Sequence, residues 1–299
     1  MKQKVVSGTT FQDRVGVVGL GIMGSAMSAN LARAGFSVRG YDPLARRRAE
    51  LKKAGGHPAR SVRELARRSP IVITSLPSGE ALLEVSTDLA AARIPGQVVI
   101  ETSTLPIAVK DAARKVLAAR GVTLLDCPLS GTGAQARTKD LAVYASGPRA
   151  ACRRCVPVFE GFARAHYFLG AFGTGSKMKF VANLLVAIHN VSAAEALVLG
   201  MKAGLDPDAM VKVLGDGAGS SRMLQVRGPM MAKRSYKDAT MKVEVWQKDM
   251  AIIADFVRSL KSPAPLFTAS RAVYDAAMKS GLAKADTAAV CAVLEARKK

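Results

Sequence analysis

Residues that form disulfide frameworks, metal centres and base-stacking surfaces are scarce in this sequence. Its 299 residues include four cysteines, three histidines and one tryptophan, and aromatic residues make up only 5%. Cys152 and Cys155 have the spacing of a metal or redox pair, but no second pair is present to complete a zinc site. We therefore expect reduced thiols, no metal and a cytoplasmic location.

Acidic residues are also scarce, since 23 Asp and Glu stand against 44 Lys and Arg and give a net charge of +21. Such a charge can indicate nucleic acid or membrane headgroups as partners. The basic clusters, such as 46–48, 67–68 and 153–154, are scattered, and few aromatic side chains are available to stack on bases. We expect a solvated basic surface that steers an anionic substrate and a dinucleotide, and nucleic acid is disfavoured as a partner.

A signal peptide and an uninterrupted transmembrane segment are lacking as well. Residues 1–13 have no apolar core and are expected to form a flexible tail. The stretch 180–199 is nearly long enough to span a bilayer. Four polar residues interrupt it: Asn183, His189, Asn190 and Glu195. A charge within a span is costly, so the stretch predicts a buried helix between two domains and no membrane association.

What the sequence does contain is a glycine-rich turn directly behind a short β-branched run. Residues 15–18 are followed by Gly19, Gly21 and Gly24, and a helical pattern covers residues 25–34. In such a strand–turn–helix the first glycine permits the tight turn and the second lets backbone approach a pyrophosphate. The third lets helix and strand pack closely. The pyrophosphate would then lie on the free N–H groups of the helix N-terminus.

A second predicted strand, at 36–41, ends at Asp42. That carboxylate follows the glycine turn by about 20 residues, the spacing of an acid that binds the adenosine ribose hydroxyls. The context of strand, helix and strand therefore favours dinucleotide binding over glycines that serve packing alone.

Strand and helix patterns alternate as far as residue 169, which is typical of a parallel, doubly wound sheet. Further strands are predicted at 71–77, 97–104, 122–126, 141–146 and 166–169, with helices at 44–54, 61–68, 80–92 and 106–119. Ser61 and Glu64 have the spacing of a capping box. Beyond residue 175 only helices are predicted, at 176–203, 208–214, 245–260 and 265–279. We predict an α/β Rossmann domain over 14–175, joined by a long interdomain helix to an all-α substrate or dimerisation domain over 176–299.

In such sheets ligands bind beyond the carboxyl ends of the strands. Five loops are expected at that rim: 19–24, Asp42, 76–77, 102–104 and 128–133. The last is rich in glycine and N–H donors. Its backbone and the Ser130 hydroxyl can hold a carboxylate.

Oxidation of an alcohol by hydride transfer requires a group that accepts the hydroxyl proton. The sequence offers three histidines, at His57, His166 and His189, which we interpret as structural. Lys179 can serve if burial and neighbouring positive charge lower its pKa. Asn183, four residues further along the predicted helix, projects from the same face. The alternative is an ordinary surface lysine like Lys177, and the local pattern does not separate the two.

Four spaced motifs carry a resemblance to a known family. Gly19-Leu20-Gly21-Ile22-Met23-Gly24 resembles a GLGxMG signature, and residues 126–132 (DCPLSGT) resemble the loop D-x-P-x-S-G-G. Residues 173–183 resemble G-x-G…K-x-x-x-N, and residues 246–250 (WQKDM) resemble a K-D-L/M segment. In this order, from Arg14 to the C-terminus, they resemble the β-hydroxyacid dehydrogenases. That family contains 3-hydroxyisobutyrate dehydrogenase, tartronate semialdehyde reductase and the more distant 6-phosphogluconate dehydrogenase.

The resemblance implies a role for each matching residue. Lys179 is implied as the catalytic acid/base, Asn183 as a residue that orients substrate, and Ser130, Gly131 and Thr132 as the substrate-carboxylate loop. The residues implied to bind the dinucleotide are Gly19, Leu20, Gly21, Ile22, Met23, Gly24, Asp42, Leu76, Pro77, Thr104 and Lys248. Without the resemblance, Lys248 and Asp249 indicate only a surface ion pair. A homodimer or homotetramer is also implied.

Two features of the sequence bear on specificity. Thr132 replaces the second glycine of the family's loop, which predicts a change in substrate size or polarity. Asp42 favours NAD because an acid repels a 2′-phosphate, whereas Arg46 and Arg47 leave NADP open.

The sequence therefore predicts an NAD(P)-dependent oxidoreductase that transfers a hydride between nicotinamide and a small 3-hydroxy acid. Candidate substrates are 3-hydroxyisobutyrate, glycerate or tartronate semialdehyde, and threonate. One alternative is a non-catalytic dinucleotide-binding or nucleic-acid-associated module, against which the Lys179 and Asn183 pair argues. Another is an imine reductase on the same scaffold, which has no need of a carboxylate loop.

Overall fold

The computed structural model describes residues 13–297, and the predicted tail lies outside the described residues except for Asp13. The chain divides into two compact units, one that ends at Lys179 and one that begins at Phe180. Each unit is described by itself.

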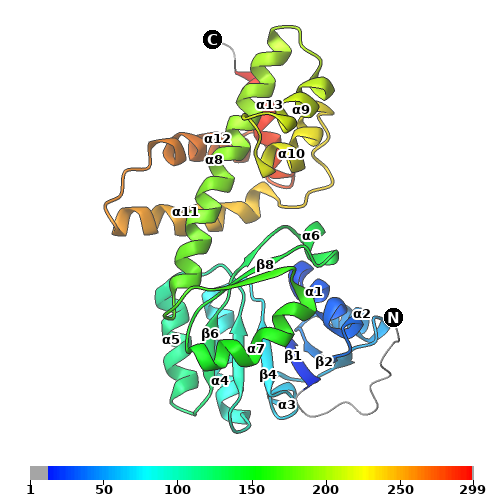
Figure 1. Cartoon of the computed structure of the whole chain (residues 1–299), viewed down its shortest axis with the longest axis vertical. Helices are drawn as coiled ribbons and strands as arrows, with labels where there is room; N and C mark the ends of the chain where they lie inside the picture. Colours follow the sequence, from blue (N-terminus) through cyan, green and yellow to red (C-terminus); the bar gives the residue numbers. More distant parts are fainter. Residues whose placement is uncertain (1–12, 298–299) are drawn as a thin grey trace. The chain divides into compact units, whose positions relative to one another are not determined.

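The first unit is built on a six-stranded sheet in which every pair of neighbours is parallel (Figure 1). Its strands are β1 (Arg14–Val18), β2 (Ser37–Tyr41), β3 (His57–Pro58), β4 (Ile71–Thr74), β5 (Val98–Glu101) and β6 (Thr123–Asp126). Their order is β3-β2-β1-β4-β5-β6. The connections therefore reverse direction between β1 and β4, and in doubly wound sheets that switch point is where a ligand binds. The predicted Rossmann fold is confirmed.

Helices connect the strands, and a small second sheet follows β6. The helices are α1 (Ile22–Arg33), α2 (Ala45–Lys53), α3 (Val62–Ala66), α4 (Gly79–Ala92), α5 (Ile107–Ala118), α6 (Gly133–Arg137) and α7 (Arg149–Phe162). The second sheet has the order β7 (Leu129–Ser130), β8 (Ala142–Ala145) and β9 (Ala165–Phe168). Because β7 begins three residues after β6 ends, this sheet carries the predicted carboxylate loop.

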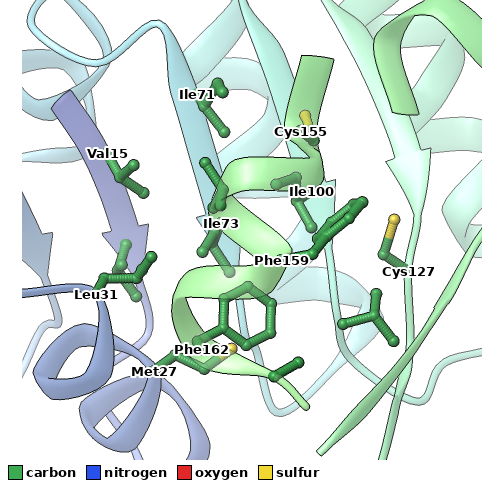
Figure 2. Close-up of a cluster of buried hydrophobic side chains, with 14 of the residues drawn as sticks. Val15, Met27, Leu31, Ile71, Ile73, Ile100, Cys127, Cys155, Phe159 and Phe162 are labelled. Atoms are coloured by element: carbon green, nitrogen blue, oxygen red, sulfur yellow. The ribbon is translucent and has the colours of Figure 1, made fainter. Parts of the chain in front are cut away.

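Two apolar layers form the core of this unit, one on each face of the large sheet. On one face, side chains of β1, β4 and β5 pack against α1 and α7, as Val15, Ile73, Leu31 and Phe159 illustrate in Figure 2. On the other face, Val72 and its neighbours pack against α3, α4 and α5. The central strands are apolar on both sides because both faces of a parallel sheet are covered by helices.

Three of the four cysteines, Cys127, Cys152 and Cys155, belong to the first of these layers. All four are buried free thiols, and Cys127 and Cys155 lie within the first apolar layer (Figure 2). Burial raises the pKa of Cys152 to about 11 and that of Cys155 to about 12. A thiol rather than a thiolate at neutral pH is a poor nucleophile and a poor metal ligand. Within residues 13–297, no group of three or more metal-binding side chains occurs.

The second unit contains only helices among its described residues, 180–297 (Figure 1). The elements are α8 (Thr174–Lys202), which begins in the first unit, α9 (Pro207–Asp216), α10 (Arg222–Ala232), α11 (Val243–Ser259), α12 (Pro265–Lys279), the 3₁₀ turn η2 (Thr287–Ala289) and α13 (Val290–Ala296). The predicted helical character of this half is confirmed.

Helix α8 is the one described helix that is long and apolar enough to cross a membrane. The side-chain amide N–H groups of its buried Asn190 nevertheless find partners within the helical unit. Buried Asn190 donates to the Tyr274 hydroxyl at 3.0 Å and to the Thr287 carbonyl at 2.9 Å. Buried hydrogen bonds of this kind are typical of a helix in the core of a globular unit. They agree with the buried helix that the sequence predicts for residues 180–199.

Two local predictions need correction. Ser61 caps α3 by accepting the N–H of Glu64, but the Glu64 carboxylate accepts the N–H of Arg60, so the reciprocal capping box does not form. His57 falls between the predicted helices 44–54 and 61–68, where no strand is predicted, but it lies in β3 because its segment extends the sheet beside β2.

Candidate active site

The glycine turn has the shape that a dinucleotide requires. Gly19 has a φ of +90°, and a Cβ there would collide with the Ser75 carbonyl. A Cβ on Gly24 would collide with the Gly19 carbonyl. Both positions therefore need glycine so that β1, β4 and α1 can approach one another.

The position of Gly21 is different, because its side-chain direction is open. The nearest atom to a Cβ built there is a guanidinium nitrogen of Arg47, at 4.0 Å. Gly21 is also the N-cap of α1, and no side chain caps this helix. An open glycine face beside uncapped helical N–H groups fits an anionic pyrophosphate, so the residues present suit a dinucleotide.

Asp42 lies at the end of β2, beside this turn, and is buried. Its carboxylate accepts the N–H of Leu20 and the N–H of Leu44, both at 2.9 Å, and Nη1 of Arg47 at 3.1 Å. Burial alone would raise the pKa of Asp42, but these donors together hold it below its usual value. The carboxylate is therefore charged and partly neutralised by Arg47. The spacing between the glycine turn and Asp42 identifies the acid but does not predict this cationic partner.

The loops that follow β4 and β5 are joined at the same rim. The N–H of Leu76 donates to the Ser103 hydroxyl at 2.8 Å, and the N–H of Ser103 donates to the Glu101 carboxylate at 2.9 Å. Leu76 and Thr104 are half-buried, and Pro77 is exposed. Three of the predicted dinucleotide residues therefore lie on loops whose backbone is fixed by buried hydroxyl and carboxylate groups.

The predicted carboxylate loop lies against the glycine turn. A Cβ on Gly133 would collide with Ile22, and the Asn30 amide of α1 donates to the Ala136 carbonyl of α6 at 2.7 Å. Ser130 is half-buried at the end of β7, and Gly131 is exposed with a φ of +134°. The structure thus brings the glycine turn and the predicted carboxylate loop together within the first unit.

Thr132 has a structural task in this loop. Its hydroxyl accepts the N–H of Gln135 at 3.4 Å, and its own N–H donates to the Gln135 side chain at 2.9 Å. This capping box starts α6, a short helix where the sequence indicates a loop. The side chain that replaces the family's glycine is therefore engaged within the loop itself.

Lys179 and Lys177, which the sequence pattern does not separate, differ in exposure. Lys177 is exposed, whereas Lys179 is half-buried. Lys179 lies in the second turn of α8, and the N–H of Ser176, three residues earlier, donates to the Asp126 carboxylate at 2.8 Å. The start of the helix that carries Lys179 is therefore fixed to the end of β6, four residues before Ser130.

Asn183 and Lys248 belong to the second unit, where Asp249 links them. The Asn183 amide donates to Asp249 at 3.0 Å, and the Lys248 ammonium lies 3.5 Å from the same carboxylate. Asp249 is buried, so this is more than the surface ion pair that the local pattern indicates. In the sequence, only the K-D-M segment points to a role for Asp249. Its partner Asn183 is 66 residues away, so no local pattern links the two.

The fold and the glycine cradle define a Rossmann-type dinucleotide-binding protein, and comparisons with known proteins refine this class. A family model described as the NAD binding domain of 6-phosphogluconate dehydrogenase matches residues 14–170. A second, described as NAD-binding of NADP-dependent 3-hydroxyisobutyrate dehydrogenase, matches residues 173–294. Together they cover nearly all of the described chain.

Curated relatives have similar lengths. The L-threonate dehydrogenase of Cupriavidus necator is 36% identical over 92% of this chain and 94% of its own. A probable 3-hydroxyisobutyrate dehydrogenase of Mycobacterium bovis is 31% identical over 95% of this chain and 98% of its own.

Solved structures are also similar to this chain. The 3-hydroxyisobutyrate dehydrogenase of Salmonella typhimurium is 31% identical, with a TM-score of 0.85 over 94% of this chain and 99% of that one. An imine reductase from Pseudomonas sp. is 20% identical, with a TM-score of 0.63 over 94% of this chain and 99% of that one. This second likeness shows the shared fold alone.

The chain belongs to the β-hydroxyacid dehydrogenase family. The predictions of an oxidoreductase, of nicotinamide-dinucleotide binding and of a small hydroxy acid as the class of substrate are thereby confirmed. The comparisons give no support to a nucleic-acid-associated module or an imine reductase.

Proposed function

We propose that this protein oxidises a small 3-hydroxy acid with NAD, with Lys179 as the group that accepts the hydroxyl proton. The observation that carries the proposal is the arrangement of three parts of the first unit. The glycine turn contacts the carboxylate loop through Ile22 and Gly133, and the start of α8 is bonded to the end of β6 through Ser176 and Asp126. Binding of dinucleotide, binding of substrate and proton transfer are thus assigned to neighbouring elements.

In the proposed mechanism, Ser130 and Gly131 bind the substrate carboxylate, and Asn183 orients the substrate. Thr132 acts by holding the loop in shape, since its hydroxyl and N–H are engaged with Gln135. The bound nicotinamide supplies the hydride acceptor. Lys179 takes the hydroxyl proton in the oxidation and returns it in the reverse reaction, as a general base and then a general acid. Lys248 contacts cofactor or substrate.

The proposed dinucleotide contacts are those of the glycine turn, with Leu76, Pro77 and Thr104 lining the site. We propose NAD as the main dinucleotide because the Asp42 carboxylate, directly after β2, repels a 2′-phosphate. The guanidinium of Arg47 pairs with that carboxylate at 3.1 Å and reduces its repulsion of a 2′-phosphate, so NADP is accepted as the second choice.

The relatives named above narrow the substrates to test. We propose L-threonate and 3-hydroxyisobutyrate as the first candidates, since proteins of those names are 36% and 31% identical to this chain. We further propose a cytoplasmic homodimer or homotetramer, with residues 14–175 serving dinucleotide binding and residues 176–299 serving substrate binding and assembly.

The proposal is tested by following dinucleotide reduction at 340 nm on L-threonate, 3-hydroxyisobutyrate and D-glycerate, with NAD and with NADP. We expect turnover on at least one acid and a higher kcat/KM with NAD. The methyl ester of the preferred acid is the matched control, and it should react poorly because its carboxylate charge is gone. Equal turnover of acid and ester would contradict the role of the 130–132 loop.

A further inference from the structure

Three charged side chains lie together in the interior of the first unit, below the candidate site. The Lys110 ammonium of α5 is 2.6 Å from the Glu101 carboxylate at the end of β5 and 2.8 Å from the Asp126 carboxylate at the end of β6. All three side chains are at most 1% exposed. Two buried carboxylates thus share one buried cation, an arrangement that is costly unless further donors satisfy the remaining oxygens.

Those further donors come from the first turn of α8 and from the second sheet. Ser176 of α8 donates both its hydroxyl, at 2.7 Å, and its N–H, at 2.8 Å, to Asp126. The Ser146 hydroxyl lies 3.2 Å from the same carboxylate and accepts the N–H of Gly175 at 3.0 Å. The carboxylate therefore caps α8, where the helix dipole favours a negative charge.

The fit around this cap is tight. A Cβ on Gly175 would lie 2.7 Å from the Asp126 carbonyl and would collide with the Tyr144 carbonyl. The absence of a side chain at Gly175 therefore allows the first turn of α8 to lie this close to β6 and β8. This turn cannot move away without breaking the two bonds of Ser176 to Asp126.

The hydrogen bonds of this buried charge cluster lead to residues that have roles in the proposed reaction. Lys179 is one helical turn after Ser176, and Ser130 is four residues after Asp126. Glu101 accepts the N–H of Ser103, whose hydroxyl holds the Leu76 backbone on the dinucleotide side. One buried charge cluster thus connects the loops assigned to dinucleotide and substrate with the turn that precedes the proposed base.

We propose that Asp126 and Ser176 are positioning residues that set the place of the Lys179 amine, with Lys110 as the buried cation that holds the Asp126 carboxylate in place. This inference rests on the proposed function of Lys179. A displacement of about 1 Å at a reacting group can cost on the order of a hundredfold in rate. Loss of one hydrogen bond between Ser176 and Asp126 at the start of α8 should therefore lower kcat and leave the binding of NAD and of the hydroxy acid unchanged.

The test is Ser176→Ala, which removes the hydroxyl bond to Asp126 and keeps the backbone bond. The matched control is Ser86→Ala, which removes a buried hydroxyl of α4 that has no hydrogen-bond partner within residues 13–297. We expect Ser176→Ala to lower kcat about tenfold, with KM for the hydroxy acid and Kd for NAD within about twofold of the unaltered protein. The deuterium isotope effect on hydride transfer should rise. Ser86→Ala should leave all four quantities unchanged.

A second variant, Asp126→Asn, keeps the shape of the side chain and removes its charge. We expect a fall in kcat on the order of a hundredfold, again without loss of NAD binding. A kcat of Ser176→Ala within twofold of the unaltered protein would overturn the inference, as would equal losses in kcat and in NAD affinity. Absence of turnover by the unaltered protein on every acid would refute the proposed function, and the positioning role with it.

Discussion

Replacement of Arg47 by alanine should weaken NADP binding about tenfold and leave NAD binding nearly unchanged. The Arg47 guanidinium lies 3.1 Å from Asp42 and 4.0 Å from the open face of Gly21, at the point where the adenosine ribose of a dinucleotide is expected. A hydrogen bond to a charged group contributes about 1.5–3 kcal/mol. The Arg47 side chain is 36% exposed, so solvent screening argues for the lower end, and 1.4 kcal/mol corresponds to tenfold in Kd.

Asp42 should keep its position in this variant because the N–H groups of Leu20 and Leu44 still hold its carboxylate. With the guanidinium gone, that carboxylate also repels a 2′-phosphate more strongly, which acts in the same direction. The effect on NAD is expected to be less than about threefold, since NAD has a hydroxyl in place of the 2′-phosphate.

Titration calorimetry with NAD, NADP, 5′-AMP and adenosine 2′,5′-bisphosphate measures this difference directly. The matched control is Arg46→Ala, because Arg46 is 79% exposed and lies 3.8 Å from Glu50 on the same helix. Equal losses for NAD and NADP in Arg47→Ala would refute the reasoning, as would a loss of NADP affinity in Arg46→Ala of the same size.

Three further predictions follow from buried groups. Lys110→Met should lower the free energy of unfolding by about 3–5 kcal/mol in urea titrations, because it leaves two buried carboxylates without their cation. On the same helix, Lys115→Met removes an exposed ion pair and should cost less than about 1 kcal/mol. Burial alone would raise the pKa of Asp286, but the Arg227 guanidinium and nearby N–H groups hold it below 3.8. The contribution of the charged Asp286 carboxylate to the free energy of unfolding is therefore complete above that pH. It is lost as the pH falls through the lower pKa that Asp286 has in the folded protein. Unfolding midpoints measured from pH 5 to pH 2 should fall less steeply in Asp286→Asn. The thiols of Cys152 and Cys155, with pKa values of about 11 and 12, should resist alkylation at pH 7.5 in the native protein, and rapid labelling by a maleimide would contradict their burial.

The sheet could be predicted from the sequence because its strands are short apolar runs that end in glycine, proline or hydroxyl residues. The segments that were missed lack such signals. Helix α7 carries Pro157 in its interior and the Cys152-Arg153-Arg154-Cys155 pattern that draws attention to metals. Strand β3 has two residues and exists only because β2 offers it an edge.

The candidate site shows the same division between local and long-range information. The glycine turn is a local signature, and the structure gives a steric reason for Gly19 and Gly24, whereas Gly21 presents an open face. The links from Ser176 to Asp126 and from Asn183 to Asp249 join residues that are 50 and 66 positions apart in the sequence. No local pattern predicts such pairs. Thr132 illustrates a third case, because a departure from the family's loop proves to be a helix cap.

The central claim is that Lys179 exchanges the proton of the substrate hydroxyl, and Lys179→Ala beside Lys177→Ala tests it most directly. The two lysines share one helix, but Lys177 is exposed and Lys179 is half-buried. We predict that Lys179→Ala lowers kcat by about 10²–10⁴ with Kd for NAD unchanged, whereas Lys177→Ala retains full turnover. Turnover by Lys179→Ala within tenfold of the unaltered protein, or an equal loss in Lys177→Ala, would contradict the account.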